Sequence, residues 1–287
     1  MMMAVGNMLE FKKTDFNQKD KSGISEAFVP KYGKHLAFGY TADIYLNGDQ
    51  VIKVFSRDFE KDLVFREAFC MACVERTGIN IPQILEIRQE NGFWVVVSEY
   101  ISGEDQLKAI CAASMAGDVK KAQDILRRIT AYQAEINQKV SPCLPDYREY
   151  VRTIITGNPH LSEVCREKTL QYLDTLPRGS GIVHGDFHPQ NVLLREDGKM
   201  YVIDWVEAGS AALGADAARS YMNYLFMPPV PPLMNPELKL AEVYLETYMQ
   251  ETGVSKEEIE AWLPVHAAIS YGEKADWYNT GIKRFLL

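Results

Sequence analysis

The chain of 287 residues is long enough to bury one large core or the cores of two lobes, and its 47% hydrophobic and 24% charged residues are ordinary for a globular protein. Its 39 acidic and 31 basic residues give a formal net charge of −8. A protein that binds phosphate backbones normally has the opposite balance, so we expect no nucleic-acid partner.

The cysteines and the apolar runs indicate a cytoplasmic protein. No apolar run approaches the ~20 residues needed to cross a bilayer, so we expect no membrane association, and residues 1–10 lack the pattern of a signal peptide. The five cysteines are an odd number scattered along the chain, which predicts reduced thiols. Cys70 and Cys73 have the spacing of a metal or redox pair. They fall in a helical pattern, however, so we interpret them as buried helix cysteines.

The first half of the chain predicts a small antiparallel sheet with one helix packed on it. Four strand-like runs are found at residues 44–46, 51–55, 84–88 and 93–100. They are joined in pairs through Asn47-Gly48 and Asn91-Gly92, and both dipeptides favour tight hairpin turns. A helical stretch from about residue 57 to residue 77 separates the hairpins and stops at Gly78, a residue type that is common just beyond a helix.

After Gly103 the pattern changes to that of long amphipathic helices. They are predicted at residues 106–140 and 161–176. Helices resume after Asn235-Pro236, which reads as a cap followed by a first helical residue, and after Ser255, whose spacing to a glutamate is that of a capping box. A short hairpin interrupts this helical half.

That hairpin brings oxygen ligands together. Its strands are predicted at residues 192–194 and 200–203, so Asn191 before the first strand and Asp204 after the second lie side by side at its open end. Carboxylate and amide oxygens suit Mg²⁺, which usually shares its shell with substrate phosphates. Asp186 lies on the loop that feeds the first strand, where it can accept a proton from an attacking hydroxyl. The sequence therefore predicts a phosphoryl-transfer site.

These residues carry a resemblance to a known family. The run His184 to Asn191, together with Ile203-Asp204-Trp205, resembles the aminoglycoside phosphotransferase and choline kinase branch of the protein-kinase-like superfamily. In that branch the loop reads His-Gly-Asp-x-His-Pro-x-Asn and the metal Asp sits in Ile-Asp-Trp, and both motifs match here at every fixed position. The resemblance covers roughly residues 39–218.

The resemblance implies an α+β fold with the two lobes of a protein kinase. A small antiparallel-sheet lobe that binds the nucleotide is expected at residues 1–100, with a hinge at residues 98–101. A larger helical lobe is expected at residues 102–287, and it would hold the catalytic loop and the acceptor site.

The resemblance also implies an ion pair near the nucleotide phosphates. Lys53 lies in the middle of a predicted strand, where its ammonium would contact the phosphates, and Glu67 on the following helix would hold it in place. Glu60 and Glu75 are the alternatives on that helix, but the first is too near its start and the second is close to its end.

Two further stretches are expected to bind ATP. The phosphate-covering loop would lie at residues 38–43, where Gly39 is the one glycine and Thr41 would supply a hydroxyl. At the predicted hinge, the Ser98 carbonyl and the Tyr100 amide would meet the adenine edge, to within one residue.

Three polar residues near the catalytic loop have structural interpretations. The resemblance implies that His184 orders the loop through backbone hydrogen bonds. His188 would brace Asp186 or a metal ligand, with a purely structural role as the alternative. Asp216 matches a buried aspartate that anchors the catalytic loop from a helix start, although helix capping alone would also explain it.

Together these features predict an Mg²⁺-dependent phosphotransferase that uses ATP, with GTP as the alternative donor, and a small hydroxyl-bearing acceptor. Aminoglycosides, choline-like amines, amino alcohols and sugars are the candidate acceptors. A protein kinase is the first alternative, but no separate activation segment follows Asp204. The second is a pseudokinase without turnover, and the intact set of Lys53, Asp186, Asn191 and Asp204 argues against it. Nothing in the sequence indicates an oligomeric state.

The acceptor pocket is expected between the C-terminal helices, from about residue 236 onward, and at residues 147–155. Acidic side chains there would bind amines or would be an ordinary solvated face. Aromatic side chains would enclose a quaternary ammonium or would be part of the core. The acidic candidates are Glu257, Glu258, Glu260, Glu273 and Asp276, and the aromatic ones are Trp262, Trp277 and Tyr278.

Overall fold

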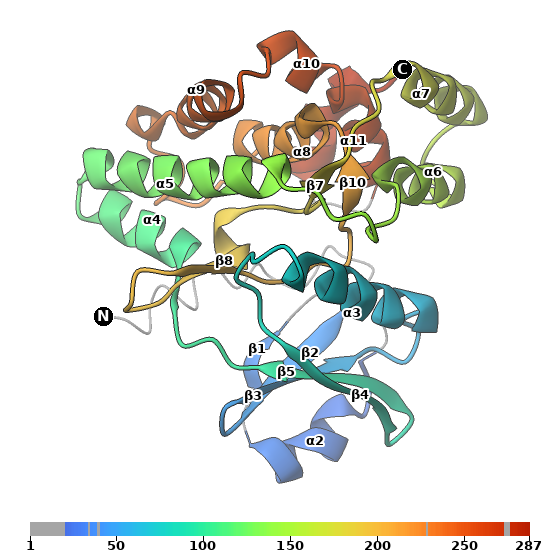
Figure 1. Cartoon of the computed structure of the whole chain (residues 1–287), viewed down its shortest axis with the longest axis vertical. Helices are drawn as coiled ribbons and strands as arrows, with labels where there is room; N and C mark the ends of the chain where they lie inside the picture. Colours follow the sequence, from blue (N-terminus) through green and yellow to red (C-terminus); the bar gives the residue numbers. More distant parts are fainter. Residues whose placement is uncertain (1–20, 34, 39–40, 228, 273–275) are drawn as a thin grey trace.

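A computed structural model describes residues 21–33, 35–38, 41–227, 229–272 and 276–287. The described chain has a sheet part, which runs to Glu99, and a larger helical part, which runs from Gln106 (Figure 1). This mixed architecture confirms the predicted fold class. The division into lobes at residues 1–100 and 102–287, with a hinge at residues 98–101, stays a prediction. Gly39 and Glu273 lie outside the described residues.

The sheet part contains five antiparallel strands in the order β1-β2-β3-β5-β4. Its strands are β1 (His35–Phe38), β2 (Ala42–Asn47), β3 (Gln50–Phe55), β4 (Ile84–Glu90) and β5 (Phe93–Glu99). Both predicted hairpins are confirmed. In the second, Asn91 and Gly92 both have positive φ (52° and 79°), the backbone that a two-residue hairpin turn requires. Strand β1 was not predicted, because its four residues are too few to show an alternating pattern.

One helix covers each face of this sheet. Ile24 and Phe28 of α2 (Ile24–Tyr32) pack with Ile52 and other side chains of one face. Val64 of α3 (Lys61–Glu75) packs with Phe55 and other side chains of the opposite face. Because successive side chains of a strand alternate between faces, Lys53 of β3 points toward the face that α3 covers.

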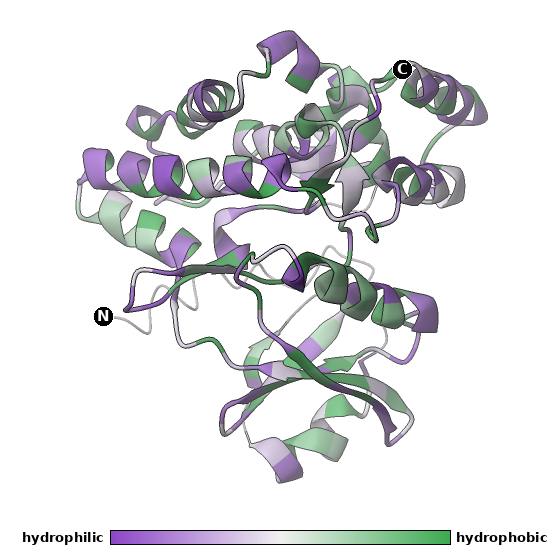
Figure 2. Cartoon of the chain, viewed as in Figure 1, coloured by the Kyte–Doolittle hydropathy of each residue, from purple (hydrophilic) through white to green (hydrophobic). Residues whose placement is uncertain are grey.

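The first long helix of the helical part is broken in two. Residues 106–140 were predicted as one helix, but the structure has α4 (Gln106–Met115) and α5 (Val119–Gln138). Gly117, at φ 74°, turns the chain between them, and the Asp118 carboxylate caps α5 by accepting from the Lys121 amide. Figure 2 shows that α5 is amphipathic, with hydrophilic and hydrophobic residues on different faces.

The helical part also contains further α-helices and 3₁₀ turns, of which α8 is buried at the centre (Figure 1). They are α6 (Tyr147–Gly157), α7 (Glu163–Thr175), α8 (Leu213–Leu225), α9 (Leu240–Thr252), α10 (Lys256–Glu260), α11 (Leu263–Ser270), α12 (Asp276–Ile282) and the 3₁₀ turns η1 (Pro189–Asn191), η2 (Pro236–Leu238) and η3 (Lys283–Phe285). The Ser255–Glu258 capping box is confirmed. The helix predicted after Asn235 begins instead as the short turn η2, and α9 starts only at Leu240.

The predictions about Cys70 and Cys73 and about membrane spans can be compared with the structure. Cys70 and Cys73 are buried in α3, and both are free thiols, as predicted. Among the described residues no helix combines the length and the apolar character needed to span a membrane.

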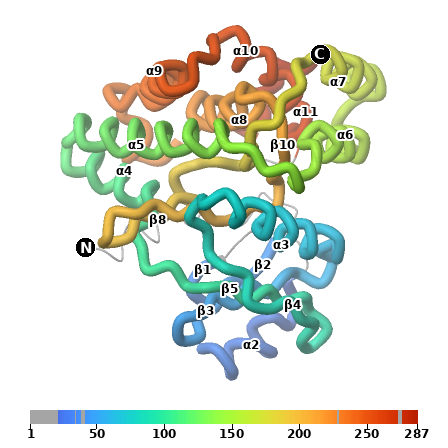
Figure 3. Tube along the Cα trace, viewed as in Figure 1, coloured from blue at the N-terminus to red at the C-terminus, as the bar shows by residue number. Residues whose placement is uncertain are grey.

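Two small sheets place the hairpin of the predicted site. Strands β8 (Val192–Leu194) and β9 (Met200–Val202) form the predicted hairpin, and β6 (Glu104–Asp105) pairs with β8. Strand β7 (Gly181–Val183) pairs with β10 (Gly209–Ala211). The chain enters the Asp186 loop from β7, and it reaches β10 shortly after Asp204. Figure 3 shows β8 between the sheet part and the main group of helices.

Candidate active site

The loop that carries Asp186 lies directly on the segment that follows Asp204. Gly185 has φ 87°, a backbone that disfavours residues with a side chain. A Cβ atom at this position would lie 2.5 Å from the Cβ of Glu207 and 2.8 Å from its carbonyl oxygen. Both the backbone conformation and the close approach therefore require glycine before Asp186.

Asp216 anchors this loop from the first turn of α8. Its carboxylate is fully buried and accepts hydrogen bonds from the Gly185 amide (2.8 Å), the Gln133 amide group (3.0 Å) and the Asn137 amide group (2.8 Å). The donors come from the catalytic loop and from α5, which favours anchoring over simple capping of α8.

A buried polar network extends this anchor. The hydroxyl groups of Tyr244 and Tyr248 on α9 donate to Gln133 (3.0 Å) and Asn137 (2.7 Å), and Ser220 donates to the Phe187 carbonyl in the loop (2.8 Å). Sequence reasoning missed these residues. Their signal was the presence of polar side chains on the otherwise apolar faces of helices.

His184 joins the two halves of the site through backbone contacts. Its Nδ1 accepts from the Asp186 amide (3.2 Å), so its Nε2 carries the hydrogen and donates to the Ile203 carbonyl (3.0 Å). Burial lowers the pKa of this imidazole, which favours the neutral ring. Both are backbone hydrogen bonds, the kind of contact that the family resemblance implied for His184.

Asn191 and Asp204 meet at the open end of the hairpin. The Ile203 amide donates to the Asn191 carbonyl (3.0 Å), which fixes the two chain segments side by side. The Asn191 amide group donates to the Asp186 carbonyl (3.1 Å), so its Oδ1 is left to act as a ligand. Asp204 has a left-handed backbone (φ 68°) and a side chain that is 46% exposed. One carboxylate and one amide oxygen form a donor set that fits Mg²⁺.

Lys53 forms the predicted ion pair with Glu67 and also contacts Asp204. Its ammonium lies 2.8 and 2.9 Å from the two Glu67 oxygens and 3.1 Å from an Asp204 oxygen. Burial by itself lowers the pKa of this ammonium, but the carboxylates of Asp204 and Glu67 outweigh burial and raise it. Lys53 therefore stays charged. Lys53 also lowers the pKa of Asp204.

Arg219 and His188 both approach the Asp186 carboxylate. Arg219 of α8 places a guanidinium nitrogen 3.3 Å from Asp186 Oδ1, and His188 Nε2 lies 3.6 Å from Oδ2. Arg219 is buried and also donates to the Ser270 hydroxyl. Sequence reasoning missed Arg219, although an arginine within a run of small and aromatic residues was a usable signal. The position of His188 agrees with bracing of Asp186.

The expected nucleotide contacts have mixed outcomes. Thr41 lies between β1 and β2, and its carbonyl accepts from the Ser56 amide (2.8 Å). The neighbouring Gly39 lies outside the described residues. The Tyr100 amide donates to the Asp49 carbonyl (2.8 Å), so it already has a partner in this structure, and its contact with adenine stays a prediction, to within one residue.

Ser98, the other residue predicted to contact adenine, lies inside the sheet. Ser98 lies opposite Val51 of β3 and Ile84 of β4, between two paired strands. The chain leaves the sheet only after Glu99, and the amide of Ile101 is the next one beyond Tyr100. Adenine contacts one residue further on, at Glu99 and Ile101, would leave the bond between the Tyr100 amide and Asp49 in place.

The aromatic candidates for the acceptor site do not form one cluster. Trp262 is fully buried in the core, and Tyr278 is buried and donates to Asn223 (3.2 Å). Trp277 is partly exposed, and its ring packs edge-on against Tyr278 (5.6 Å between centroids). The core interpretation therefore holds for Trp262 and Tyr278.

Some of the acidic candidates have local structural roles. Glu258 accepts from the Ser255 amide (2.8 Å) in the capping box, and Glu260 pairs with Lys256 (3.5 Å). Asp276 is exposed in the first turn of α12. A role of these acidic side chains in acceptor binding stays a prediction.

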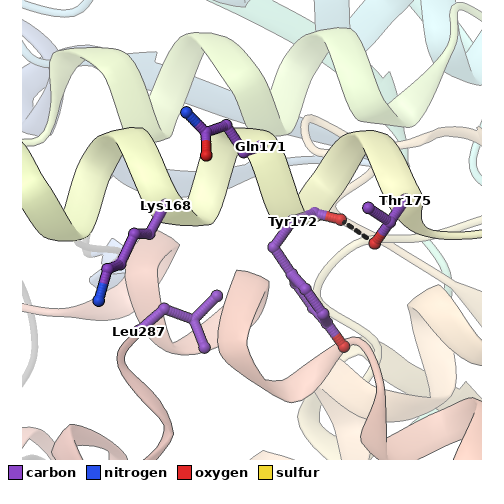
Figure 4. A pocket seen from close by; sticks show the side chains of 5 residues that line it. All are labelled: Lys168, Gln171, Tyr172, Thr175 and Leu287. Carbon is purple, nitrogen blue, oxygen red and sulfur yellow. Dashed lines mark hydrogen bonds between the residues drawn. The ribbon is translucent and has the colours of Figure 1, made fainter.

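A surface hollow elsewhere on the helical part has no link to these residues. It lies between α7 and the last residue, and Figure 4 shows the side chains that line it, which are Lys168, Gln171, Tyr172, Thr175 and Leu287. None of them belongs to the predicted site.

Comparisons with known proteins identify the family of the chain and proteins of similar fold. The model of the phosphotransferase enzyme family, called APH, matches residues 34–251. None of the curated proteins matches the chain.

Choline kinase LicA from Streptococcus pneumoniae is similar in structure, with a TM-score of 0.57 at 16% identity, over 88% of this chain and 90% of that one. Aminoglycoside phosphotransferase APH(4)-Ia has a TM-score of 0.55 at 17% identity, over 90% and 95%. Aminoglycoside phosphotransferase APH(3'')-Id from Streptomyces rimosus has a TM-score of 0.53 at 16% identity, over 83% and 93%.

Proposed function

The chain belongs to the phosphotransferase enzyme family, and from that premise we propose that it transfers the γ-phosphate of ATP to a hydroxyl group of a small molecule. One observation carries the proposal: Lys53, Glu67 and Asp204 form a connected set of ion pairs beside the loop of Asp186 and Asn191. Each residue type in this constellation has a task in phosphoryl transfer.

The nucleotide side of the site is supported by charge and by one similar structure. APH(4)-Ia has been solved with the ATP analogue AMP-PNP and hygromycin B. In this chain the charged ammonium of Lys53, held by Glu67, would contact the phosphates. Thr41 and the backbone near Glu99 and Ile101 would contact the rest of the nucleotide. ATP is the proposed donor and GTP the alternative.

Asn191 and Asp204 would hold Mg²⁺. A bound Mg²⁺ supplies positive charge that neutralises the phosphate oxygens as the phosphoryl group leaves. Asp186 would accept the proton of the acceptor hydroxyl and orient that oxygen for attack. Arg219 and His188 hold the carboxylate of Asp186 in place, and Asp216 holds the backbone of its loop.

The acceptor would be a cationic molecule that carries a hydroxyl, such as an aminoglycoside, a choline-like amine or an amino alcohol. The excess of 39 acidic over 31 basic residues supports a cation, and so does the exposed carboxylate of Asp276 at the start of α12. A neutral sugar is the remaining candidate. Measuring ATP consumption with a panel of amino alcohols, aminoglycosides and sugars tests the proposal, and a lack of ATP turnover with every member would contradict it.

Reversing the charge of Asp276 is expected to weaken acceptor binding selectively. Asp276→Lys should raise the acceptor KM roughly 3- to 10-fold, the scale of an exposed charge pair that becomes a repulsive one, with little change in the KM for ATP. The effect should shrink as salt is added, because salt screens exposed charges. Steady-state kinetics at low and high salt provide the measurement. Glu167→Lys on the exposed side of α7 is the matched control and should leave both KM values unchanged. Equal effects of the two reversals would remove Asp276 from the acceptor site.

A further inference from the structure

We propose that Arg66 is a positioning residue for phosphoryl transfer, which ties helix α3 to the segment 205–208 that follows Asp204. The proposal deepens the phosphotransferase function proposed above and depends on it. Arg66 has no place in the motifs that predict the site, and its role follows from its contacts in the folded chain.

The guanidinium group of Arg66 reaches from the sheet part to the helical part. Its Nε donates to the Val206 carbonyl (3.0 Å) and its Nη2 donates to the Ala208 carbonyl (2.7 Å). Its Cζ atom lies 4.4 Å from the centre of the Tyr150 ring on α6, which is a favourable cation–π distance. One side chain thus joins α3, the segment after Asp204 and α6.

A second contact on the same face of α3 supports this tie. Cys70 lies one helical turn after Arg66, and its thiol also points to the Ala208 carbonyl (3.5 Å). The segment itself is firmly placed, because Trp205 and Ala208 are fully buried. The face of α3 that carries Arg66 and Cys70 is therefore docked on a largely buried piece of backbone.

The position of this segment affects both halves of the proposed site. Val206 is two residues after Asp204, and Glu207 is in the close contact with Gly185, beside Asp186. On the other side of the tie, Glu67 follows Arg66 directly in α3 and pairs with Lys53 (2.8 Å). Arg66 therefore couples the position of the Lys53–Glu67 pair to the positions of the two aspartates.

Arginine suits this task better than lysine does. Its planar fork donates to two carbonyl groups at once, whereas an ammonium on a flexible stem would reach one of them with less definition. The two carbonyl partners are neutral, so these hydrogen bonds fix a distance between two backbone segments. Small displacements of reacting groups can cost ~10²-fold in rate, so losing this tie should affect turnover.

Arg66→Ala is expected to lower kcat about 10- to 100-fold per folded molecule and to raise the Mg²⁺ concentration needed for half-maximal rate, with a change in acceptor KM of less than ~3-fold. The folded fraction is measured by circular dichroism. Arg66→Lys should recover part of the loss. If the alanine variant does not fold, Arg66→Lys replaces it in the test, and its kcat is expected to be lower than the parental kcat by ~3-fold or more.

The control is a second arginine, which lies away from the site and also donates to two carbonyl groups. Arg166 of α7 is half-buried like Arg66, and its Nη2 donates to the carbonyls of Asn158 (2.9 Å) and Leu161 (3.3 Å). Arg166→Ala should lower the melting temperature and leave kcat per folded molecule and the Mg²⁺ requirement unchanged. If Arg66→Ala behaves as Arg166→Ala does, Arg66 is only structural and the proposal fails.

A double-mutant cycle tests whether Arg66 acts through the Lys53–Glu67 pair. Glu67→Gln should lower kcat by itself, and adding Arg66→Ala to it should cost at most ~3-fold more, because the two changes disturb the same arrangement. If the kcat of the double variant instead falls by the product of the two single losses, the proposal is contradicted. Hydrogen exchange of the amides at residues 204–208, which needs no activity, should be faster in Arg66→Ala than in the parental protein and unchanged in Arg166→Ala.

Failure of this inference can be distinguished from failure of the proposed function. A parental protein that turns over ATP with an acceptor, together with Arg66 variants of parental kcat and Mg²⁺ requirement, overturns the role of Arg66 alone. A parental protein that turns over no ATP overturns the proposed function. In that case unchanged hydrogen exchange at residues 204–208 in Arg66→Ala would still refute the tie.

Discussion

Asp186→Asn is expected to lower kcat by ~10²-fold or more, because an amide cannot accept the proton of the acceptor hydroxyl as a carboxylate does. The KM for ATP should change little, since Asp186 would act on the acceptor side while Lys53 and Asp204 would act on the phosphates. Steady-state kinetics with saturating acceptor measure the first effect, and binding of an ATP analogue by calorimetry measures the second.

The structure indicates a second consequence of this substitution, which the measurement must take into account. Arg219 is buried with its guanidinium nitrogen 3.3 Å from Asp186, so the loss of the carboxylate leaves a buried positive charge without its partner. Removing one member of a buried pair is destabilising. Asp186→Asn should therefore also lower the melting temperature, and its kcat must be expressed per folded molecule.

Asp197→Asn is the matched control for the base. It makes the same chemical change in the exposed turn of the hairpin, where the Asp197 carboxylate accepts from the Lys199 amide (3.1 Å). This variant should keep the parental kcat. Parental turnover in Asp186→Asn would show that another group takes the proton, or that the reaction needs no base at this position.

Local patterns were sufficient to predict much of the site. Asn191 and Asp204 come together because a hairpin with a short turn has only one register that buries its apolar residues, and Ile203 bonds to Asn191 as that register requires. The alternation of β3 indicated only that Lys53 points away from the face of its two neighbours, and its pairing with Glu67 was implied by the family resemblance. For the hairpin the distance along the chain is short, so the sequence defines the geometry.

The parts that were missed depend on contacts between distant segments. Arg66 meets residues 206 and 208, Arg219 meets Asp186, and Gln133 meets Asp216, and no local pattern indicates which backbone a helical side chain will face. The hydrogen bond of the Tyr100 amide was not predicted, for a related reason. Its partner, Asp49, lies in the turn of another hairpin, and the match between them follows from the sheet register as a whole.

The break between α4 and α5 shows a different limit. Residues 106–140 have apolar side chains at helical spacing throughout, so periodicity alone favours one helix. Gly117 and Asp118 form a stop and a cap in the middle of that pattern, and the turn lets α5 pack back against α4. The local signal of Gly117-Asp118, which ends one helix and starts another, should therefore have been given more weight than the helical spacing of the apolar residues.

Asp204→Asn is expected to abolish Mg²⁺-dependent nucleotide binding and to lower turnover by at least ~10²-fold. Asparagine is the informative substitution here. Asp204 has a left-handed backbone (φ 68°), which asparagine tolerates and alanine does not, so Asp204→Asn removes the charge without adding backbone strain. Calorimetric titration of an ATP analogue over a range of Mg²⁺ concentrations measures the binding.

Asn191→Ala gives the graded comparison, because a neutral oxygen is a weaker ligand than a carboxylate. It should raise the Mg²⁺ requirement and leave some turnover, whereas Asp204→Asn should leave almost none. The Lys53 ammonium loses one of its carboxylate partners in the Asp204 variant but keeps Glu67 (2.8 Å), so nucleotide binding without Mg²⁺ should persist. Unchanged Mg²⁺ dependence in Asp204→Asn would exclude this carboxylate as a ligand. Equal loss of nucleotide binding with and without Mg²⁺ would instead indicate that Asp204 acts through Lys53, since only a ligand makes the loss depend on the metal.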